Sequence, residues 1–198
     1  MSELDFLCPD LAHPDPERGF EPLAHSAMKR RLSDAGGMFE AQAGWLVPST
    51  RSAKRPAGPS VSDISQLTKI EVRGAKPRAA DNREIVAVGP HRWLVLCEGD
   101  IAGAVRASLE EPGQIVVDQT AALAGLRIEG TECQTLMRRL TDLDLDRLPA
   151  VGAVAKVPAT VLRDGPEAFR IFLPQQSADY VCEVVLDAAA ALAGGAAA

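Results

Sequence analysis

The stretch "VSDISQLTKIEVRG", Val61 to Gly74, has a near copy later in the chain, "VVDQTAALAGLRIEG", Val116 to Gly130. Both begin with Val-x-Asp-x-(Ser/Thr), continue through a leucine, and end in an apolar-x-apolar-x-Gly pattern. In "KIEVRG", apolar residues alternate with charged ones, which is the period of a half-buried strand. A pattern written twice in this way indicates a duplicated structural unit.

The segments that follow the two copies have the same order. After the first copy, "REIVAVGPHRWLVLCE" predicts two strands joined at Gly89-Pro90, and Asp100 can cap a helix over "IAGAVRASLEE". After the second copy, "ATVLRDGPEAFRIFLP" predicts two strands around Asp164-Gly165. The last helix then gathers apolar residues on one side: Val181, Val184, Val185, Ala188 and Leu192. We therefore expect an α+β fold of duplicated strand–strand–hairpin–helix units that share a core.

The second unit has an extra helix, "TECQTLMRRL". Thr131 and Gln134 fit a capping box at its start. Its apolar residues recur at helical spacing and predict one buried face: Cys133, Leu136, Met137 and Leu140.

The predicted organisation is an N-terminal arm, residues 1–20, and a single duplicated domain, residues 21–198. Repeat 1 covers about 61–111 and repeat 2 about 116–192. Before the repeats, a short helix ending at the Gly36-Gly37 pair and an extended segment are expected. The arm is acidic and broken by prolines. Its apolar residues are expected to dock on a partner, or alternatively to pack on this same chain: Leu4, Phe6, Leu7 and Leu11.

Composition excludes several classes of protein. The 198 residues carry a net charge of −6, which argues against nucleic acid as the main partner. The N-terminus lacks the basic and apolar regions of a secretory signal, and no apolar run is long enough to span a bilayer. Four cysteines without a Cys-x-x-Cys pair are typical of reduced thiols in a cytosolic protein: Cys8, Cys97, Cys133 and Cys182.

Few residues suggest chemistry. Asp63 and Asp118 occupy the same position in the two copies and could be paired carboxylates for acid–base work. The interpretation as Asx turns is favoured, because one role repeated at symmetric positions suits a turn. His13 lies five residues after Cys8, but a zinc site needs more ligands. We therefore predict no catalytic, cofactor-binding or metal-ligating residue.

The two tryptophans mark packing positions. Trp93 is expected in the core, whereas Trp45 could lie either in the core or at an interface.

Residues 22–187 resemble the folate-binding aminomethyltransferase family, which includes the T-protein of the glycine cleavage system. The resemblance rests on the order of "PLAHSAMKRRLSDAGGMFEAQAGWLVP" and the two repeated stretches, the second leading into "TECQTLMRRLTDLDLDRLP". The short chain and "VGPHRWLVLCEG" are similar to the gamma subunits of heterotetrameric sarcosine oxidases. This resemblance implies a duplicated α+β fold.

The chain departs from the family where the catalytic members act. The family's Gly-Gly-x-x-Asp-Asp stretch is reduced, so that its acting aspartate falls on Asn82, beside Asp81. In the family, a glutamate helps to hold folate. In the corresponding stretch of this chain, only Arg163 and Glu167 remain as candidates, and the spacing is shortened. These departures predict that the chain neither binds folate nor transfers a methylene group.

The resemblance implies a non-catalytic structural gamma subunit of a cytoplasmic, flavin-dependent sarcosine oxidase. FAD, FMN, NAD, tetrahydrofolate and zinc would belong to the partner alpha, beta and delta subunits, and the chain would mainly contact the large alpha subunit. The alternative is a free-standing folate-dependent aminomethyltransferase or folate-binding protein. That alternative requires a catalytic carboxylate at Asp81 and a folate anchor at Glu167.

Overall fold

The computed structural model describes residues 23–42, 44–48, 58–81, 83–98 and 102–195. The elements in chain order are α1 (Lys29–Asp34), β1 (Phe39–Gln42), β2 (Trp45–Pro48), β3 (Ser60–Asp63), β4 (Thr68–Arg73), β5 (Glu84–Gly89), β6 (Arg92–Cys97), α2 (Ala102–Leu109), β7 (Ile115–Asp118), β8 (Leu123–Glu129), α3 (Cys133–Leu140), β9 (Ala150–Val154), β10 (Val157–Gly165), β11 (Ala168–Pro174), η2 (Gln175–Ser177) and α4 (Ala178–Gly195). The predicted arm, Asp100 and Asn82 lie outside the described residues.

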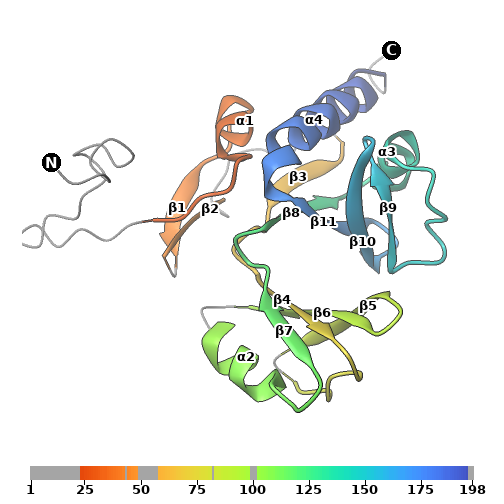
Figure 1. Ribbon diagram of the computed structural model, residues 1–198. Coiled ribbons are helices and arrows are strands. Elements are labelled where there is room, and N and C mark those ends of the chain that lie inside the picture. The colour runs from red at the N-terminus through yellow and green to blue at the C-terminus, as the bar shows by residue number, and fades with distance from the viewer. Residues whose placement is uncertain (1–22, 43, 49–57, 82, 99–101, 196–198) are drawn as a thin grey trace, which may run out of the picture.

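Two antiparallel sheets form two units, one above the other in Figure 1. The lower sheet has the strand order β5-β6-β4-β7, and the upper sheet has the order β3-β8-β11-β10-β9. The lower unit also holds α2, and the upper unit holds α1, α3 and α4. The expected α+β fold is therefore confirmed.

The two repeats exchange their first strands. β3 of repeat 1 pairs with β8 in the upper sheet, and β7 of repeat 2 pairs with β4 in the lower sheet. With β3 matched to β7, β4 to β8, and hairpin β5–β6 to hairpin β10–β11, both sheets have the same order. β9 and α3 are the additions of repeat 2. The exchange means that neither sheet is made from one repeat alone.

The two hairpins share a detail that the duplication explains. The strand register shifts between Ala87 and Gly89 in one hairpin, and between Arg163 and Gly165 in the other. Both shifts lie on the first strand just before the turn, so the duplication extends to local irregularities.

Three groups of buried apolar side chains hold the molecule together. One lies between the lower sheet and α2: Ile70, Val72, Val95, Cys97, Val105 and Leu109. A larger one lies between the upper sheet and helices α1, α3 and α4. The third, the inter-sheet cluster, joins the two sheets: Val86, Leu94, Leu96, Leu162 and Phe172. Alternation along β6 explains this arrangement, because Val95 and Cys97 face α2 while Leu94 and Leu96 face the other sheet.

Most predicted helices are confirmed. The apolar face of α3 is buried as expected, and the apolar side of α4 packs on the upper core. The capping box is wrong. The N-cap of α3 is Glu132, with a left-handed φ of 66° and no side-chain capping bond.

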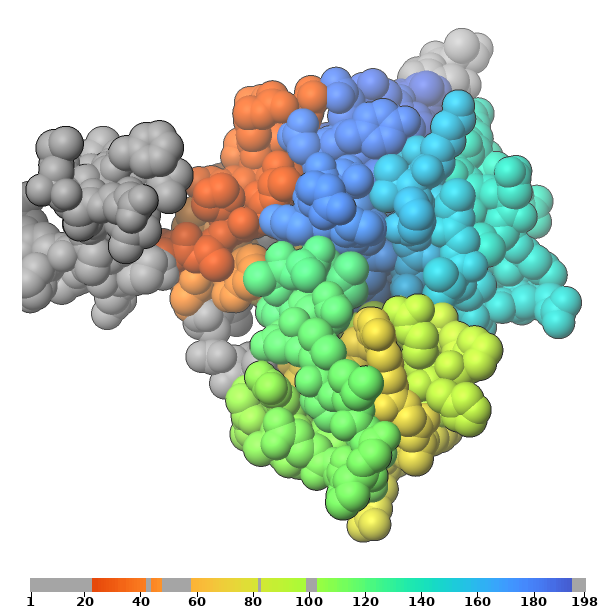
Figure 2. Space-filling model, viewed as in Figure 1, coloured from red at the N-terminus to blue at the C-terminus, as the bar shows by residue number. Residues whose placement is uncertain are grey.

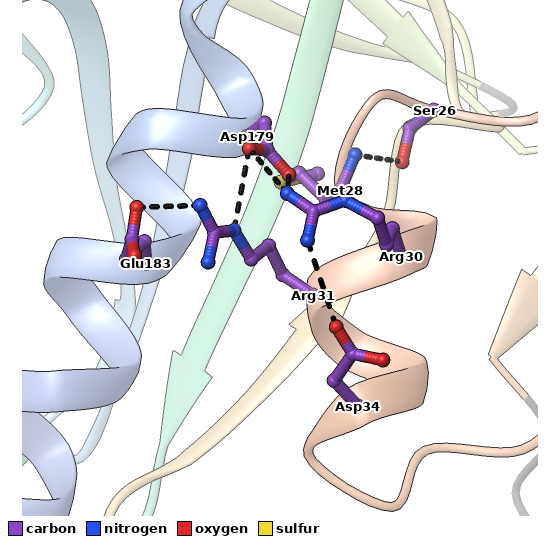
Figure 3. Close-up of polar contacts among 7 residues, drawn as sticks. All are labelled: Ser26, Met28, Arg30, Arg31, Asp34, Asp179 and Glu183. Atoms are coloured by element: carbon purple, nitrogen blue, oxygen red, sulfur yellow. Dashed lines mark hydrogen bonds and ion pairs between the residues drawn. The ribbon is translucent and has the colours of Figure 1, made fainter.

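The segment before the repeats forms α1, as the sequence predicted, and the expected extended segment folds into the β1–β2 hairpin. Two arginines of α1 fasten it to α4 (Figure 3). Arg31 places its Nε 3.2 Å from a carboxylate oxygen of Asp179 and its Nη2 2.7 Å from Glu183. Arg30 donates to Asp179 as well. The predicted short helix is thus part of the upper unit.

The tryptophans are both half-buried. Trp93 packs beside the α2 cluster and points its indole N–H at the carbonyl oxygen of Gly74, 3.4 Å away. Trp45 begins β2 and forms an isolated bridge with Ala24. None of the helices that the structure describes combines the length and apolarity needed to cross a membrane.

Candidate functional site

The two repeated aspartates both make Asx turns. An Oδ1 atom of Asp63 accepts the N–H of Ser65 at 2.8 Å, and Asp118 accepts the N–H of Thr120 at the same distance. This is the favoured sequence interpretation, in which the side chain satisfies a backbone donor two residues on. The aspartates are therefore held in structural bonds.

The hydroxyl groups of the same motif join the two repeats. Ser65 Oγ accepts the N–H of Gly125 at 3.0 Å, and Thr120 Oγ accepts the N–H of Lys69 at 3.0 Å. Two backbone bonds reinforce the crossing, from Ile64 N–H to the Gly125 carbonyl and from Gln119 N–H to the Lys69 carbonyl. Each turn is thus bonded to the strand of the other repeat. We use the term crossover for these two turns together with the first residues of the strands to which they are bonded.

The crossover also explains why the motif occurs twice. Each Val-x-Asp-x-(Ser/Thr) turn ends an exchanged strand and must be fixed where the chain passes to the other unit. A buried backbone donor without a partner costs about 1–3 kcal/mol, so Asp63 and Ser65 of the first turn satisfy two buried donors that would otherwise be costly.

Lys69 lies at the crossover and is completely buried, with 0% of its surface exposed. Its Nζ donates to the carbonyl oxygens of Ser65 and Leu67, both at 2.7 Å. Burial lowers the pKa of the amine to about 8, and the negative charges of Asp63 and Asp118 offset part of this effect. The prediction of a half-buried strand with an exposed charged face is therefore wrong for β4.

Glu71 is the second buried charge of β4. Its Oε1 accepts from Arg73 Nε at 2.6 Å and from Arg92 Nε at 3.0 Å. Burial opposes its charge, but these two guanidiniums hold the pKa of the carboxyl below its ordinary value. The burial of Lys69 and Glu71 was not predicted from the sequence. Arg73 pairs with Arg92 across β4 and β6, so this strand register could have suggested the arginine cluster.

A cavity of about 570 Å³, lined by both charged and apolar residues, lies between the two sheets. Asp81 lines it, together with the side chains of an ion-pair network. In this network, Arg170 Nη2 lies 2.8 Å from Glu84 of the lower sheet and 2.7 Å from Asp164 of the upper sheet. Burial opposes the charge of Arg170, but the bonds to Asp164 and Glu84 raise its pKa. The network ties the two sheets together beside the inter-sheet cluster.

Arg163 and Glu167 do not join Asp81 in this cavity. The guanidinium of Arg163 donates to the backbone carbonyls of Gly165, Leu145 and Pro166 and lies over the ring of Phe169. Glu167 lines a separate hollow of about 490 Å³ near the β10–β11 turn. Asp81 therefore lies apart from the β10–β11 turn region that holds Arg163 and Glu167, and the three positions do not line one cavity.

The described residues contain no group of three or more side chains suited to a metal ion. Cys8 and His13 lie outside them. The described cysteines are free and buried. Burial, with smaller contributions from Asp63 and Asp179, raises the pKa of Cys182 to about 12, so this thiol is not activated as a nucleophile.

No family model matches the chain. An aminomethyltransferase of Streptomyces avermitilis is 25% identical over 84% of this chain and 57% of that protein. The chain therefore spans little more than half the length of this curated relative.

Two solved structures share the fold. A chain of the heterotetrameric sarcosine oxidase of Corynebacterium sp. U-96 matches with a TM-score of 0.61 at 16% identity, over 71% of this chain and 88% of that one. Aminomethyltransferase T of the glycine cleavage system of Bartonella henselae matches with a TM-score of 0.61 at 18% identity, over 83% of this chain and 57% of that one. The protein therefore has an aminomethyltransferase-like fold.

Proposed function

We propose that this chain is a non-catalytic gamma subunit of a heterotetrameric, flavin-dependent sarcosine oxidase. The observation that carries the proposal is the extent of the structural match, which covers 88% of the sarcosine oxidase chain but 57% of the aminomethyltransferase chain. A chain with this fold, most of which the match covers, thus exists as one part of a larger oxidase.

The geometry of the acidic residues supports a structural role. Asp63 and Asp118 are engaged in turns, and Asp81 and Glu167 line different cavities. Oxidative demethylation of sarcosine, with transfer of the one-carbon unit to tetrahydrofolate, would then occur in the alpha, beta and delta subunits. Those chains would hold FAD, FMN, NAD, tetrahydrofolate and zinc, and the assembled enzyme would be cytoplasmic.

Co-expression with the three partner chains tests the proposal. We expect the tagged chain to purify with them in equal amounts and to be needed for a stable complex. Asp81→Ala should leave sarcosine turnover within about twofold, whereas loss of a general base lowers rates by about 10²–10⁴-fold. A partner complex that assembles and turns over sarcosine fully without this chain would exclude the gamma-subunit role.

The alternative is a free-standing folate-dependent aminomethyltransferase or folate-binding protein. Calorimetric titration of the purified chain with tetrahydrofolate, and separately with FAD, distinguishes the two. The subunit proposal predicts no saturable binding of either compound. One-to-one binding of tetrahydrofolate at micromolar concentration that is lost in Asp81→Ala would favour the alternative.

A further inference from the structure

Strand β7 is an open edge of the lower sheet. It ends the strand order, and among the described residues no strand pairs with its outer side. Gln119 N–H donates to the Lys69 carbonyl, and the antiparallel alternation directs the backbone groups of Val117 toward β4 as well. Val116 and Asp118 therefore present their backbone N–H and C=O groups outward, where another strand can pair with them.

The side chains of β7 on the face away from α2 are apolar and exposed. Ile115 is 58% exposed and Val117 is 36% exposed. The matching positions on β3, the corresponding edge of the upper sheet, are Ser60 and Ser62. An edge strand left in water is normally protected by polar or charged residues, so the apolar pair on β7 indicates that another surface covers it. Figure 2 shows this part of the chain, in green, on the front of the lower unit.

The charges around this edge balance. The charged side chains of β4 and β7, taken with the groups that interact with them directly, are three cations and three carboxylates: Lys69, Arg73, Arg92, Asp63, Glu71 and Asp118. Their sum is zero, so the edge attracts neither a strongly acidic nor a strongly basic segment. An uncharged apolar edge instead suits a partner with the same properties.

We propose that a second copy of this chain covers the edge, with the two β7 strands antiparallel and Val116 opposite Val116. The outward groups of the two Val116 residues then exchange backbone hydrogen bonds, and the two four-stranded sheets join into one. Ile115 of each copy lies opposite Val117 of the other, at a pair without hydrogen bonds, where side chains come closest. Asp118 lies opposite the uncharged Gln114. The exposed apolar side chains thus cover each other.

The charges favour this register over the neighbouring one. Within one chain, Arg73 lies beside Ile115 and Glu71 lies beside Val117. In the proposed register, each row of side chains across the joined sheet therefore runs from Arg73 of one copy to Glu71 of the other. A register centred on Val117 would place the two Glu71 carboxylates in one row and would separate Ile115 from Val117. The edge is thus complementary to itself in one register.

Sedimentation velocity of the full chain, over roughly a 100-fold range of concentration, tests the proposal. The two short strands bury far less than the roughly 800 Å² per partner of a standard interface, so we expect a weak, reversible dimer. Val117→Lys, which puts a charge into the apolar contact, should raise its dissociation constant at least about 10-fold. Val151→Lys, at a similarly exposed position on the edge strand β9, is the matched control and should leave the constant unchanged. Circular dichroism melting checks that both variants are folded.

Cysteine cross-linking tests the register. Val116→Cys brings two thiols to directly opposed positions, with Cα atoms about 5.5 Å apart, which is within the range for a disulfide. Mild oxidation should therefore give a covalent dimer well above the wild-type level, which the native cysteines set. In Asp118→Cys, the two introduced residues lie about 14 Å apart along the strands, so cross-linking should stay at that level.

Three results would overturn the proposal. The first is a chain that stays monomeric at every concentration, whatever else covers β7. The second is a dimer that Val117→Lys leaves unchanged, and the third is cross-linking of Asp118→Cys in place of Val116→Cys. These measurements use the chain alone, whereas co-expression tests the oxidase role, so failure of the dimer would leave the subunit proposal standing.

Discussion

At the scale of single residues, the buried amine of Lys69 has a measurable consequence for stability. Its pKa is about 8 in the folded chain and about 10.4 in an unfolded one, so between these values the unfolded state binds more protons. The free energy of unfolding therefore rises with pH across this window, and the cost of the buried charge is fully present below pH 8.

We expect Lys69→Met to remove this rise. Urea unfolding at several pH values between 7 and 10.5 measures it, with Lys156→Met, at an exposed lysine, as the control that keeps the wild-type pH dependence. One pKa unit corresponds to about 1.4 kcal/mol, so the difference is large enough to detect. Parallel pH profiles for Lys69→Met and wild type would contradict the buried, destabilised charge.

The two Asx-turn aspartates make a matched pair of substitutions. Asp63 is buried and accepts bonds from the Ser65 N–H and the Ser26 hydroxyl, whereas Asp118 is exposed and, among the described residues, accepts a bond from the Thr120 N–H. Asp63→Ala should cost about 1–3 kcal/mol for each donor left buried without a partner, and Asp118→Ala about 1 kcal/mol or less. Chemical denaturation of both variants checks the order, and equal losses would contradict the structural assignment.

At the scale of elements, local pattern predicted which segments form helices and strands but not how the strands are shared. The alternation in "KIEVRG" identifies β4, yet it cannot say that β4 lies beside β7 from the other repeat. The burial of Lys69 and Glu71 was missed for the same reason. Their partners are turn carbonyls and an arginine from another strand, which meet only in the folded chain.

The candidate site was predicted in part. The Asx turns followed from residue type, because Asp and Ser bond their own backbone locally. The separation of Asp81 from Glu167 could not be predicted, since it depends on how the two sheets face each other.

Gly125 lies where the chain around Ile64 closely approaches β8 at the crossover. A Cβ atom there would lie 2.9 Å from Ile64 Cγ1 and 3.1 Å from the Ile64 carbonyl oxygen. We expect Gly125→Ala to destabilise the fold by about 1–3 kcal/mol through overpacking. Gly103→Ala, within α2 with nothing inside 4 Å, should instead stabilise by up to about 1 kcal/mol. Urea midpoints of the two variants should therefore move in opposite directions, and a neutral Gly125→Ala would mean that the crossover is looser than described.

At the scale of the whole molecule, strand exchange makes the two units interdependent. The lower sheet needs β7 from repeat 2, and the upper sheet needs β3 from repeat 1. The inter-sheet cluster and the ion pairs of Arg170 add a direct contact between the sheets. Two units that were in contact only through their surfaces could unfold separately. Two sheets that each contain a strand from the other repeat cannot.

The two tryptophans allow this interdependence to be measured, because Trp45 lies in the upper unit and Trp93 in the lower unit. The variants Trp93→Phe and Trp45→Phe each keep a single tryptophan. In each variant, we expect the fluorescence transition in urea to coincide with the transition that circular dichroism measures for the same variant. Leu94→Ala, which truncates a side chain of the inter-sheet cluster that is 3% exposed, should cost about 2–5 kcal/mol and move both transitions together. A fluorescence transition of Trp93 that precedes the circular dichroism transition, in Trp45→Phe or in Trp45→Phe/Leu94→Ala, would show that the lower unit opens by itself. In that case the exchanged strands would not couple the two halves.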